Sequence, residues 1–179
     1  MGLAPINLAP QDPVSCDKSD YGWQGGYLDK PWNYAMNTGL VTDAWFPYVS
    51  GNGNVPKCPT TCPGTGSWTK YKWKSGSVVN VGGNVAKMQD QIYTNGPLTN
   101  GFSVYQDFIN YKSGVYEHKT GSYLGEHATM TIGWGNESSM DYWLVQNSWG
   151  PSWGISGFFK IKQGNCNINQ YGFGCTPAN

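Results

Sequence analysis

The sequence has little charge and no long apolar run. Charged side chains make up 12% of the 179 residues, and eleven basic residues balance eleven acidic ones. Because no net field attracts nucleic acid or an anionic bilayer, we expect neither nucleic acid nor a membrane as a partner. No apolar stretch approaches the roughly 20 residues of a membrane-spanning helix. The first five residues have neither the length nor the charge of a signal peptide.

Histidine and cysteine are also scarce. The chain has two histidines and five cysteines, and an odd number of cysteines indicates a free thiol or a lost disulfide partner. Cys58 and Cys62 have a spacing that zinc sites use, and Cys166, Cys175 or a histidine could complete a ligand set. No second compact pair follows, so the sequence favours no metal, and it implies no cofactor.

The rest of the composition is that of a globular, loop-rich protein. Hydrophobic residues make up 39% and aromatic residues 15%, which is sufficient for a core. The length suits one domain, or two small lobes that share a cleft. Twenty-five glycines and eleven prolines predict short elements joined by many turns.

A loop with a short helical turn is expected at residues 10–16, and a helix at residues 27–37 that ends at Gly39. The clearest helix is residues 84–96, with Asn84 as its N-cap and Gly96-Pro97 as its stop signal. Strand 98–106 follows. The packed face of the clearest helix is predicted to comprise Val85, Met88, Ile92 and Tyr93.

The C-terminal half predicts three antiparallel strands, at residues 127–134, 142–148 and 157–162. The first strand alternates between two sets of side chains. Its packed face is predicted to comprise Ala128, Met130, Ile132 and Trp134, and its polar face His127, Thr129 and Thr131.

One histidine and one asparagine lie at the ends of two neighbouring predicted strands. His127 opens the first strand and Asn147 ends the second, so neighbouring strands can place an imidazole beside a carboxamide. Such a pair fixes which ring nitrogen carries the proton, which a general base requires. Taken without its context, a single histidine is more often structural, and we interpret His118 as a solvated loop residue.

The blocks around these residues are GEHATMTIGWG and YWLVQNSWGPSWGISGFFKI. They resemble the His and Asn blocks of papain-family cysteine proteases, and of cathepsin B-like enzymes in particular. The segments LAPQDPVSCD, YGWQGGYLDKPWNY, KCPTTC, QIYTNGPL and FSVYQDFINYKSGVYEH have family counterparts in the same order. The resemblance implies an α+β, papain-like two-lobe fold. Residues 1–76 would be the remnant of an incomplete helical lobe, and residues 77–179 the β-rich, barrel-like lobe.

The resemblance also implies residue roles. His127 would be the base, Asn147 would orient it, and the indole of Trp149 would shield the pair from water. Gly25 and Gly26 would bind the substrate main chain, with Tyr27 beside the specificity pocket. An alternative interpretation is that the two glycines only form the turn that enters the following helix.

Glu126 precedes the proposed base. Its backbone carbonyl would hold a peptide on the P1 side of the scissile bond, and its carboxylate would favour the protonated imidazole of His127.

The family pattern pairs Cys16 with Cys58 in a disulfide and leaves Cys62 without a partner. Trp23 and Trp45 stand where related sequences have half-cystines, and Trp73 is a third candidate. Our hypothesis is that these three positions are cysteine codons read as tryptophan.

One expected part is absent from the sequence. The family's nucleophile lies in a Cys-Gly-Ser-Cys-Trp type motif upstream of the segment that matches LAPQD, and its oxyanion Gln comes slightly earlier. None of the five cysteines has this context. We therefore expect a fragment of a cathepsin B-like cysteine endopeptidase that is inactive as it stands. The short loop at residues 51–67 contains no histidine, which favours an endopeptidase over a carboxydipeptidase.

Two other functions remain open. A naturally shortened, non-proteolytic homologue could bind peptides, and a carbohydrate-binding module would explain the aromatic content but not the ordered motifs. The resemblance implies a peptide or protein substrate, with a propeptide or protein inhibitor as a further partner. It also implies a lysosomal, phagosomal or secreted location.

Overall fold

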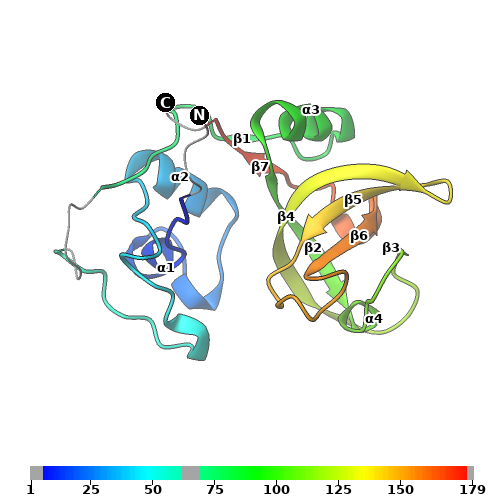
Figure 1. The fold of residues 1–179 in the computed structure, drawn as a ribbon, viewed down its shortest axis with the longest axis horizontal. Helices are drawn as coiled ribbons and strands as arrows, with labels where there is room; N and C mark the ends of the chain where they lie inside the picture. The colour runs from blue at the N-terminus through cyan, green and yellow to red at the C-terminus, as the bar shows by residue number, and fades with distance from the viewer. Residues whose placement is uncertain (1–5, 62–68, 177–179) are drawn as a thin grey trace. The chain divides into compact units, whose positions relative to one another are not determined.

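The computed structural model describes residues 6–61 and 69–176 (Figure 1). The chain forms two compact units. The first runs to Val78 and takes in the C-terminal residues from Cys175, and the second is Val79–Gly174. Cys62 lies outside the described residues.

The first unit has little regular structure. Its helices are α1 (Gln11–Cys16) and α2 (Asp29–Asn37), with the 3-10 turns η1 (Gly22–Gln24) and η2 (Ser50–Asn52). Helix α1 occurs where the sequence predicted a helical turn, and α2 where it predicted a helix. Gly39, two residues beyond α2, has φ +83°, a left-handed conformation that glycine adopts without a steric penalty.

Buried polar groups organise the first unit. Its apolar core is small, and Gln11, Asp12 and Ser50 are almost wholly buried. The Asp12 carboxylate accepts hydrogen bonds from the Tyr34 hydroxyl at 2.8 Å and the Val41 backbone N–H at 3.0 Å, and pairs with Lys70 at 2.8 Å. These bonds compensate the cost of removing a carboxylate from water.

A disulfide joins Cys16, at the end of α1, to Cys58 in the following loop region. The two residues are 42 positions apart, so the bond removes much of the conformational freedom that this segment has when unfolded. It therefore stabilises a unit whose apolar core is small.

The second unit is built on a seven-stranded sheet with strand order β1-β7-β2-β4-β5-β6-β3. The strands are β1 (Val79–Asn80), β2 (Leu98–Tyr105), β3 (Val115–Tyr116), β4 (Tyr123–Glu137), β5 (Met140–Gln146), β6 (Phe158–Lys162) and β7 (Phe173–Gly174). All neighbouring strands are antiparallel except β3 and β6, which are parallel. The predicted antiparallel set is therefore present as β4, β5 and β6.

Helix α3 (Val85–Asn95) packs on β2 and β4, and α4 (Gln106–Ile109) lies at the other end of the unit (Figure 1). The side chain of Asn84 caps α3 by accepting the backbone N–H of Lys87 at 3.0 Å. Met88 and Ile92 are buried, as predicted. Tyr93 is 86% exposed, so its placement on the packed face was wrong. Fewer side chains of α3 are buried than the apolar pattern predicted, because Tyr93 is exposed.

The inward and outward faces of β4 are the reverse of those predicted. Thr129 and Thr131 are buried, whereas Met130 and Trp134 are 39% and 40% exposed. The register explains this, because Thr131 lies opposite Leu98 of β2, a residue of the core. Directly opposed residues share a face of the sheet. The period of two predicted from the sequence is correct, but the face predicted to be packed is the exposed one.

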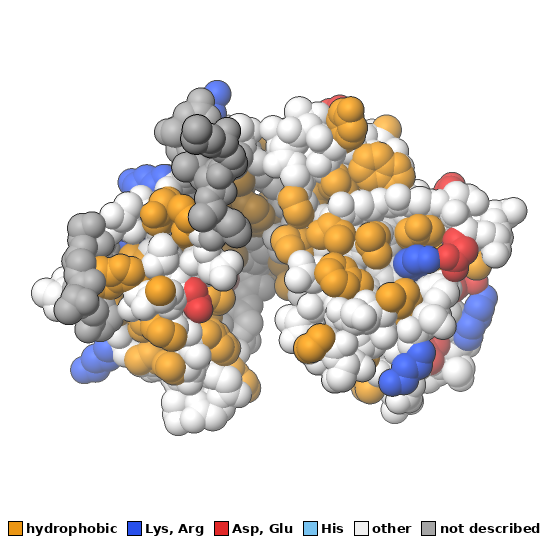
Figure 2. Space-filling model, viewed as in Figure 1, with side chains coloured by type: hydrophobic (Ala, Val, Ile, Leu, Met, Phe, Trp, Pro, Cys, Tyr) orange, Lys and Arg blue, Asp and Glu red, His pale blue; other side chains and the backbone are white. Residues whose placement is uncertain are grey.

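The core of the second unit is rich in aromatic residues, with Phe102, Phe108, Trp143 and Phe159 fully buried. The visible face of the molecule carries hydrophobic side chains among few charged ones (Figure 2). No helix among the described residues combines the length and apolar character needed to traverse a bilayer.

Candidate active site

His127 and Asn147 lie together at one edge of the β4–β5 pair. Met130 of β4 is paired with Gln146, the last residue of β5, and Asn147 follows directly. The register therefore brings an imidazole from one strand beside a carboxamide at the end of the next. Nε2 of His127 is 2.9 Å from Oδ1 of Asn147.

The backbone of Ser148 determines how this amide is oriented. Its N–H donates to Oδ1 of Asn147 at 2.8 Å. A flipped amide would turn its NH₂ group toward that N–H, placing two donors against each other. Oδ1 must therefore accept from Nε2–H of His127. The neutral imidazole then carries its proton on Nε2 and has a free lone pair on Nδ1, the arrangement of a general base.

Aromatic rings surround the imidazole. The ring of Trp149 stacks on His127 with centroids 5.1 Å apart, and Phe102 of β2 meets it edge-on at 6.0 Å. Trp149 also contacts the buried Phe108. These contacts restrict the ring's orientation and limit the access of water to one side of it.

A tight turn after β5 holds Trp149 in place. The Asn147 backbone N–H donates to the Gly157 carbonyl at 2.9 Å, which closes the segment onto itself. Gly150 and Gly157 have φ +86° and +90°, values that other residues rarely adopt. The glycines following Asn147 are thus needed for the turn's backbone.

A hollow of about 340 Å³ adjoins the pair, lined by Thr99, Ala128, Thr129, Met130, Gln146, Asn147 and Ser148. Two of its buried polar atoms, Thr129 Oγ1 and Asn147 Nδ2, have no hydrogen-bond partner among the described residues. Buried polar groups are normally paired. These atoms could therefore bind a polar ligand or another segment of polypeptide.

The Glu126 carboxylate binds neighbouring hydroxyl groups. Its Oε1 accepts from Ser103 at 2.8 Å and from Tyr123 at 3.0 Å. Register pairs Glu126 with Ser103 and His127 with Phe102, so the carboxylate and imidazole leave β4 on opposite faces. The role of its backbone carbonyl in peptide binding stays a prediction.

Gly25, Gly26 and Tyr27 belong to the first unit. They follow η1, and Tyr27 is 61% exposed with its backbone N–H bonded to Asp20 at 3.1 Å. A Cβ on Gly26 would lie 1.9 Å from Oδ1 of Asp20, so any larger residue there would displace the Asp20 carboxylate that accepts from Tyr27. The turn interpretation thus has a structural basis, and substrate binding by these residues stays a prediction.

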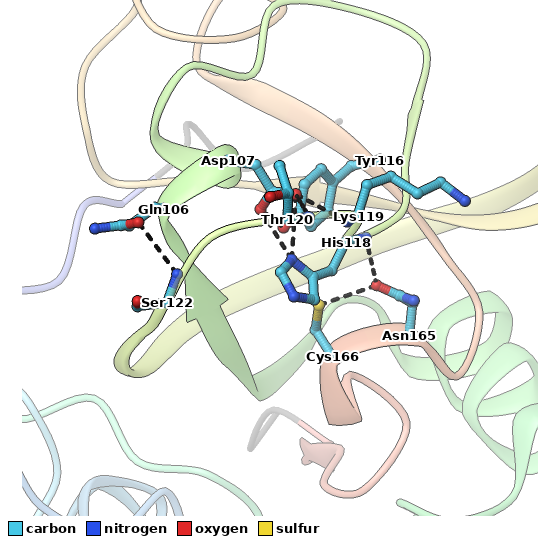
Figure 3. Close-up of polar contacts among 9 residues, drawn as sticks. All are labelled: Gln106, Asp107, Tyr116, His118, Lys119, Thr120, Ser122, Asn165 and Cys166. Atoms are coloured by element: carbon cyan, nitrogen blue, oxygen red, sulfur yellow. Dashed lines mark hydrogen bonds and ion pairs between the residues drawn. The ribbon is translucent and has the colours of Figure 1, made fainter.

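His118 is more than a solvated loop residue. Its ring stacks on Tyr105 with centroids 3.7 Å apart, and Nδ1 lies 3.1 Å from Oδ1 of Asp107 (Figure 3). Its backbone N–H donates to Asn165 at 3.0 Å. No sequence spacing indicated this cluster, because its members come from different elements.

Asp107 is the centre of that cluster. Its carboxylate also accepts from the Tyr116 hydroxyl and from the backbone N–H groups of Lys119 and Thr120 (Figure 3). Partial burial alone would raise the pKa of Asp107, but these donors and His118 outweigh it and hold that pKa well below its usual range. The cluster fixes the loop that leads into β4.

Neither described free thiol is placed as a nucleophile. Burial raises the pKa of Cys166 and of Cys175 to about 11 each, and neither is hydrogen-bonded to His127. Reactive cysteines have lowered pKa values instead. Cys58 is used by the disulfide, and the described residues contain no cluster of three or more metal-ligating side chains.

The sequence of this chain is similar to those of cysteine proteases. Residues 3–175 match the family model described as papain family cysteine protease. "Cathepsin B-like CP3" of Giardia intestinalis is 40% identical over 158 residues, covering 87% of this chain and 52% of the relative. A "gut-specific cysteine proteinase" of Caenorhabditis elegans is 42% identical over 176 residues, covering 88% and 54%.

Solved structures of cysteine proteases have a similar fold. "ProCathepsin B S9 from Trypanosoma congolense" superposes with a TM-score of 0.91 at 32% identity, covering 99% of this chain and 63% of that one. A Carica candamarcensis cysteine protease in complex with E-64 gives 0.80 at 26% identity, covering 97% and 79%. The predicted α+β, papain-like fold is thereby confirmed. The chain spans about half the length of the curated relatives it matches.

Proposed function

Because this chain belongs to the papain family of cysteine proteases, we propose that it supplies the general base of a cathepsin B-like cysteine endopeptidase. His127 is that base, Asn147 orients it, and Trp149 shields it. The observation that carries the proposal is the bond between Nε2 of His127 and Oδ1 of Asn147. It leaves Nδ1 free to take a proton from a thiol.

The proposed reaction has two halves. Nδ1 of His127 takes the proton of a cysteine thiol, and the thiolate attacks the peptide carbonyl. As the C–N bond breaks, the imidazolium returns that proton to the leaving amine, and a thioester remains. Nδ1 then takes a proton from water, the hydroxide attacks the thioester, and the thiolate leaves and is reprotonated. Asn147 stabilises the imidazolium in both halves.

The nucleophilic thiol belongs outside the four cysteines that the structure describes, and Cys62 lacks the sequence context of the family's nucleophile. Cys16 and Cys58 are bonded to each other, and the free thiols of Cys166 and Cys175 are held protonated near neutral pH. The 179-residue chain alone is therefore expected to be inactive. The absence of histidine from loop residues 51–67 supports endopeptidase rather than carboxydipeptidase activity.

Fluorogenic peptide hydrolysis tests the proposal. The 179-residue chain should show no turnover and no active-site thiol labelling, whereas the complete gene product should show both. Turnover by the complete protein should be lost in His127→Ala. Hydrolysis by the 179-residue chain, or unchanged activity in His127→Ala, would contradict the assignment.

A second candidate is a shortened homologue that binds peptides without cleaving them. The hollow beside Asn147, with its two unpaired polar atoms, favours this alternative. Peptide binding by a cooperatively folded 179-residue chain, together with a complete gene product that has no turnover, would support it over the endopeptidase.

We also propose a lysosomal, phagosomal or secreted location, because the Cys16–Cys58 disulfide suits an oxidising compartment. A peptide or protein is the proposed substrate, and a propeptide or protein inhibitor is a further proposed partner. Immunolocalisation and co-purification from the native source would test these assignments; a cytosolic distribution would contradict the first.

A further inference from the structure

The turn between β4 and β5 carries a sequence motif that the proposed function does not use. Asn136-Glu137-Ser138 has the pattern Asn-x-Ser/Thr with a middle residue other than proline, which is the acceptor sequence for N-linked glycans. No other asparagine of the 179-residue sequence has serine or threonine two positions later. Such a tripeptide also arises by chance. The position of Asn136 in the fold supplies the further evidence.

The motif spans a tight hairpin turn at the surface. Asn136 and Glu137 are the last two residues of β4, and Met140 opens β5. Ser138 and Ser139 form the two-residue loop between them, with φ +52° and +64°, the sign that a type I′ turn requires at both positions. Asn136 and both serines are exposed, and the turn projects at the edge of the second unit (Figure 1). A glycan attached here would therefore meet water rather than the core.

One face of this hairpin is covered by its own side chains. The Glu137 carboxylate pairs with Lys160, and the Lys160 ammonium group lies 5.1 Å from the centre of the Tyr142 ring. The Tyr142 hydroxyl lies over Gly135, where an added Cβ would come within 2.6 Å of it. Because successive residues of a strand point to opposite faces, Asn136 points away from this covered face.

The Asn136 amide is positioned with one hydrogen to spare. Asn136 is paired across the hairpin with Asp141, and its Nδ2 donates to Oδ1 of Asp141 at 2.8 Å. A primary amide has two N–H groups, and N-glycosylation replaces only one of them. The other N–H can still donate to Asp141. Attachment of a sugar is therefore compatible with the bond that orients this side chain.

An exposed tryptophan lies next to Asn136 on the same face of the strand. Trp134 is 40% exposed, whereas tryptophan is usually well buried. It comes two residues before Asn136, so their Cα atoms are about 7 Å apart along β4. The C–H groups of a sugar ring pack on an indole as other apolar groups do. The first sugar of a glycan on Asn136 would therefore have an apolar surface within reach.

We propose that Asn136 is the acceptor of an N-linked glycan whose first sugar packs on Trp134. The co-reactant is a lipid-linked oligosaccharide diphosphate. A bond forms between Nδ2 of Asn136 and C1 of the first sugar, and the C1–O bond to the diphosphate breaks. The amide loses one proton, and the lipid diphosphate leaves with the electron pair of the broken bond. The site is independent of the proposed protease activity and requires only the secretory route proposed above.

The complete protein, secreted from a eukaryotic host behind an added signal peptide, tests the site. Mass spectrometry of the wild type should find a glycan at Asn136, which a peptide N-glycosidase removes. Asn136→Gln and Ser138→Ala should each carry one glycan fewer than the wild type. Ser139→Ala is the matched control, because it changes the other exposed serine of the turn and leaves the acceptor sequence intact. It should keep the glycan.

Glycan transfer is scored in the cell lysate as well as in the medium, so that a variant retained through misfolding is still counted. An unmodified Asn136 in the wild type would overturn the inference. A glycan that persists at this site in Ser138→Ala, or that is lost equally in Ser139→Ala, would also overturn it.

Thermal unfolding tests the contact with Trp134. The compared quantity is the difference in Tm between Ser138→Ala, which lacks the glycan, and Ser139→Ala, which keeps it. This difference should be smaller in a Trp134→Thr background than in the wild-type background, because the sugar then has no indole to cover. Threonine suits a strand, so the hairpin itself should be retained. Equal differences in the two backgrounds would refute the packing on Trp134.

Protein from the native source separates this inference from the proposed location and activity. A glycan at Asn136 of the native protein would support both the site and the secretory route. A cytosolic native protein without the glycan, combined with modification in the secretory host, would refute the location alone. A secreted or lysosomal native protein with an unmodified Asn136 would refute the site alone. Peptide hydrolysis by Ser138→Ala should equal that of Ser139→Ala, because the turn has no part in the proposed reaction.

Discussion

Oδ1 of Asn147 lies 2.9 Å from Nε2 of His127 and 2.8 Å from the backbone nitrogen of Ser148. The Ser148 contact shows which atom of the His127–Asn147 pair carries the proton. Because the Ser148 N–H donates to Oδ1, Oδ1 is an acceptor, and Nε2 of His127 must be the donor. The backbone N–H of Ser148 therefore sets the tautomer of His127 and leaves Nδ1 unprotonated in the neutral ring.

Removing the Asn147 amide should impair the base. We expect Asn147→Ala to lower kcat/KM of the complete protein roughly 10- to 100-fold, because the imidazole loses its fixed tautomer. Asn136→Ala is the matched control, since the Asn136 side chain donates to Asp141 on the β4–β5 hairpin. In the 179-residue chain, ¹⁵N NMR should show a mostly Nε2-protonated neutral His127. A mainly Nδ1-protonated ring would contradict this geometry.

Replacing Thr131 with valine should stabilise the second unit. Thr131 is fully buried and its hydroxyl has no partner among the described residues. Valine has the same shape without the unpaired hydroxyl, so the free energy of unfolding should rise by about 1 kcal/mol. Urea denaturation measures this. Thr99→Val, at a partly exposed position, should change stability little, and a loss of stability in Thr131→Val would mean that the hydroxyl is paired.

Asp107 should make stability depend on acid pH. We expect Asp107→Asn to lower the free energy of unfolding by about 2 kcal/mol at pH 7, because several donors lose a charged acceptor. The folded pKa of Asp107 is lowered, so its contribution is present above the unfolded pKa of about 4 and declines as pH falls below it.

Denaturation of both proteins across acid pH measures this effect. The difference between wild type and Asp107→Asn should shrink below about pH 4. Asp141→Asn, on the hairpin, is the control. A constant difference down to pH 2 would contradict the assigned role.

Reducing the disulfide should weaken the first unit selectively. For a 42-residue separation, loss of the Cys16–Cys58 bond should cost about 3–4 kcal/mol. Hydrogen exchange should then increase in α1 and α2 while β2, β4 and β5 stay protected. Cys166→Ser, which removes a free thiol, should leave exchange in the first unit unchanged. Equal loss of protection in both units would show that they unfold together.

Much of the local structure was predictable from the sequence. Asn84 and Gly39 marked the ends of helices, the period of two located β4 and β5, and strands were also expected at β2 and β6. The places of His127 and Asn147 on successive strands predicted their proximity. The ordered motifs predicted the family. These features depend on contacts close in sequence, or on motifs that the chain carries directly.

Other features were decided by tertiary structure alone. The alternation of residues along β4 did not predict which face is buried, because that depends on the register between β4 and β2. In this register Thr131 is buried and Met130 is exposed. The link from Asp107 to His118 and Asn165 joins segments distant in sequence. The Glu126 carboxylate is oriented by Ser103, its partner across the sheet. Local pattern therefore determined the period of each element, and long-range packing determined the contacts of each side chain.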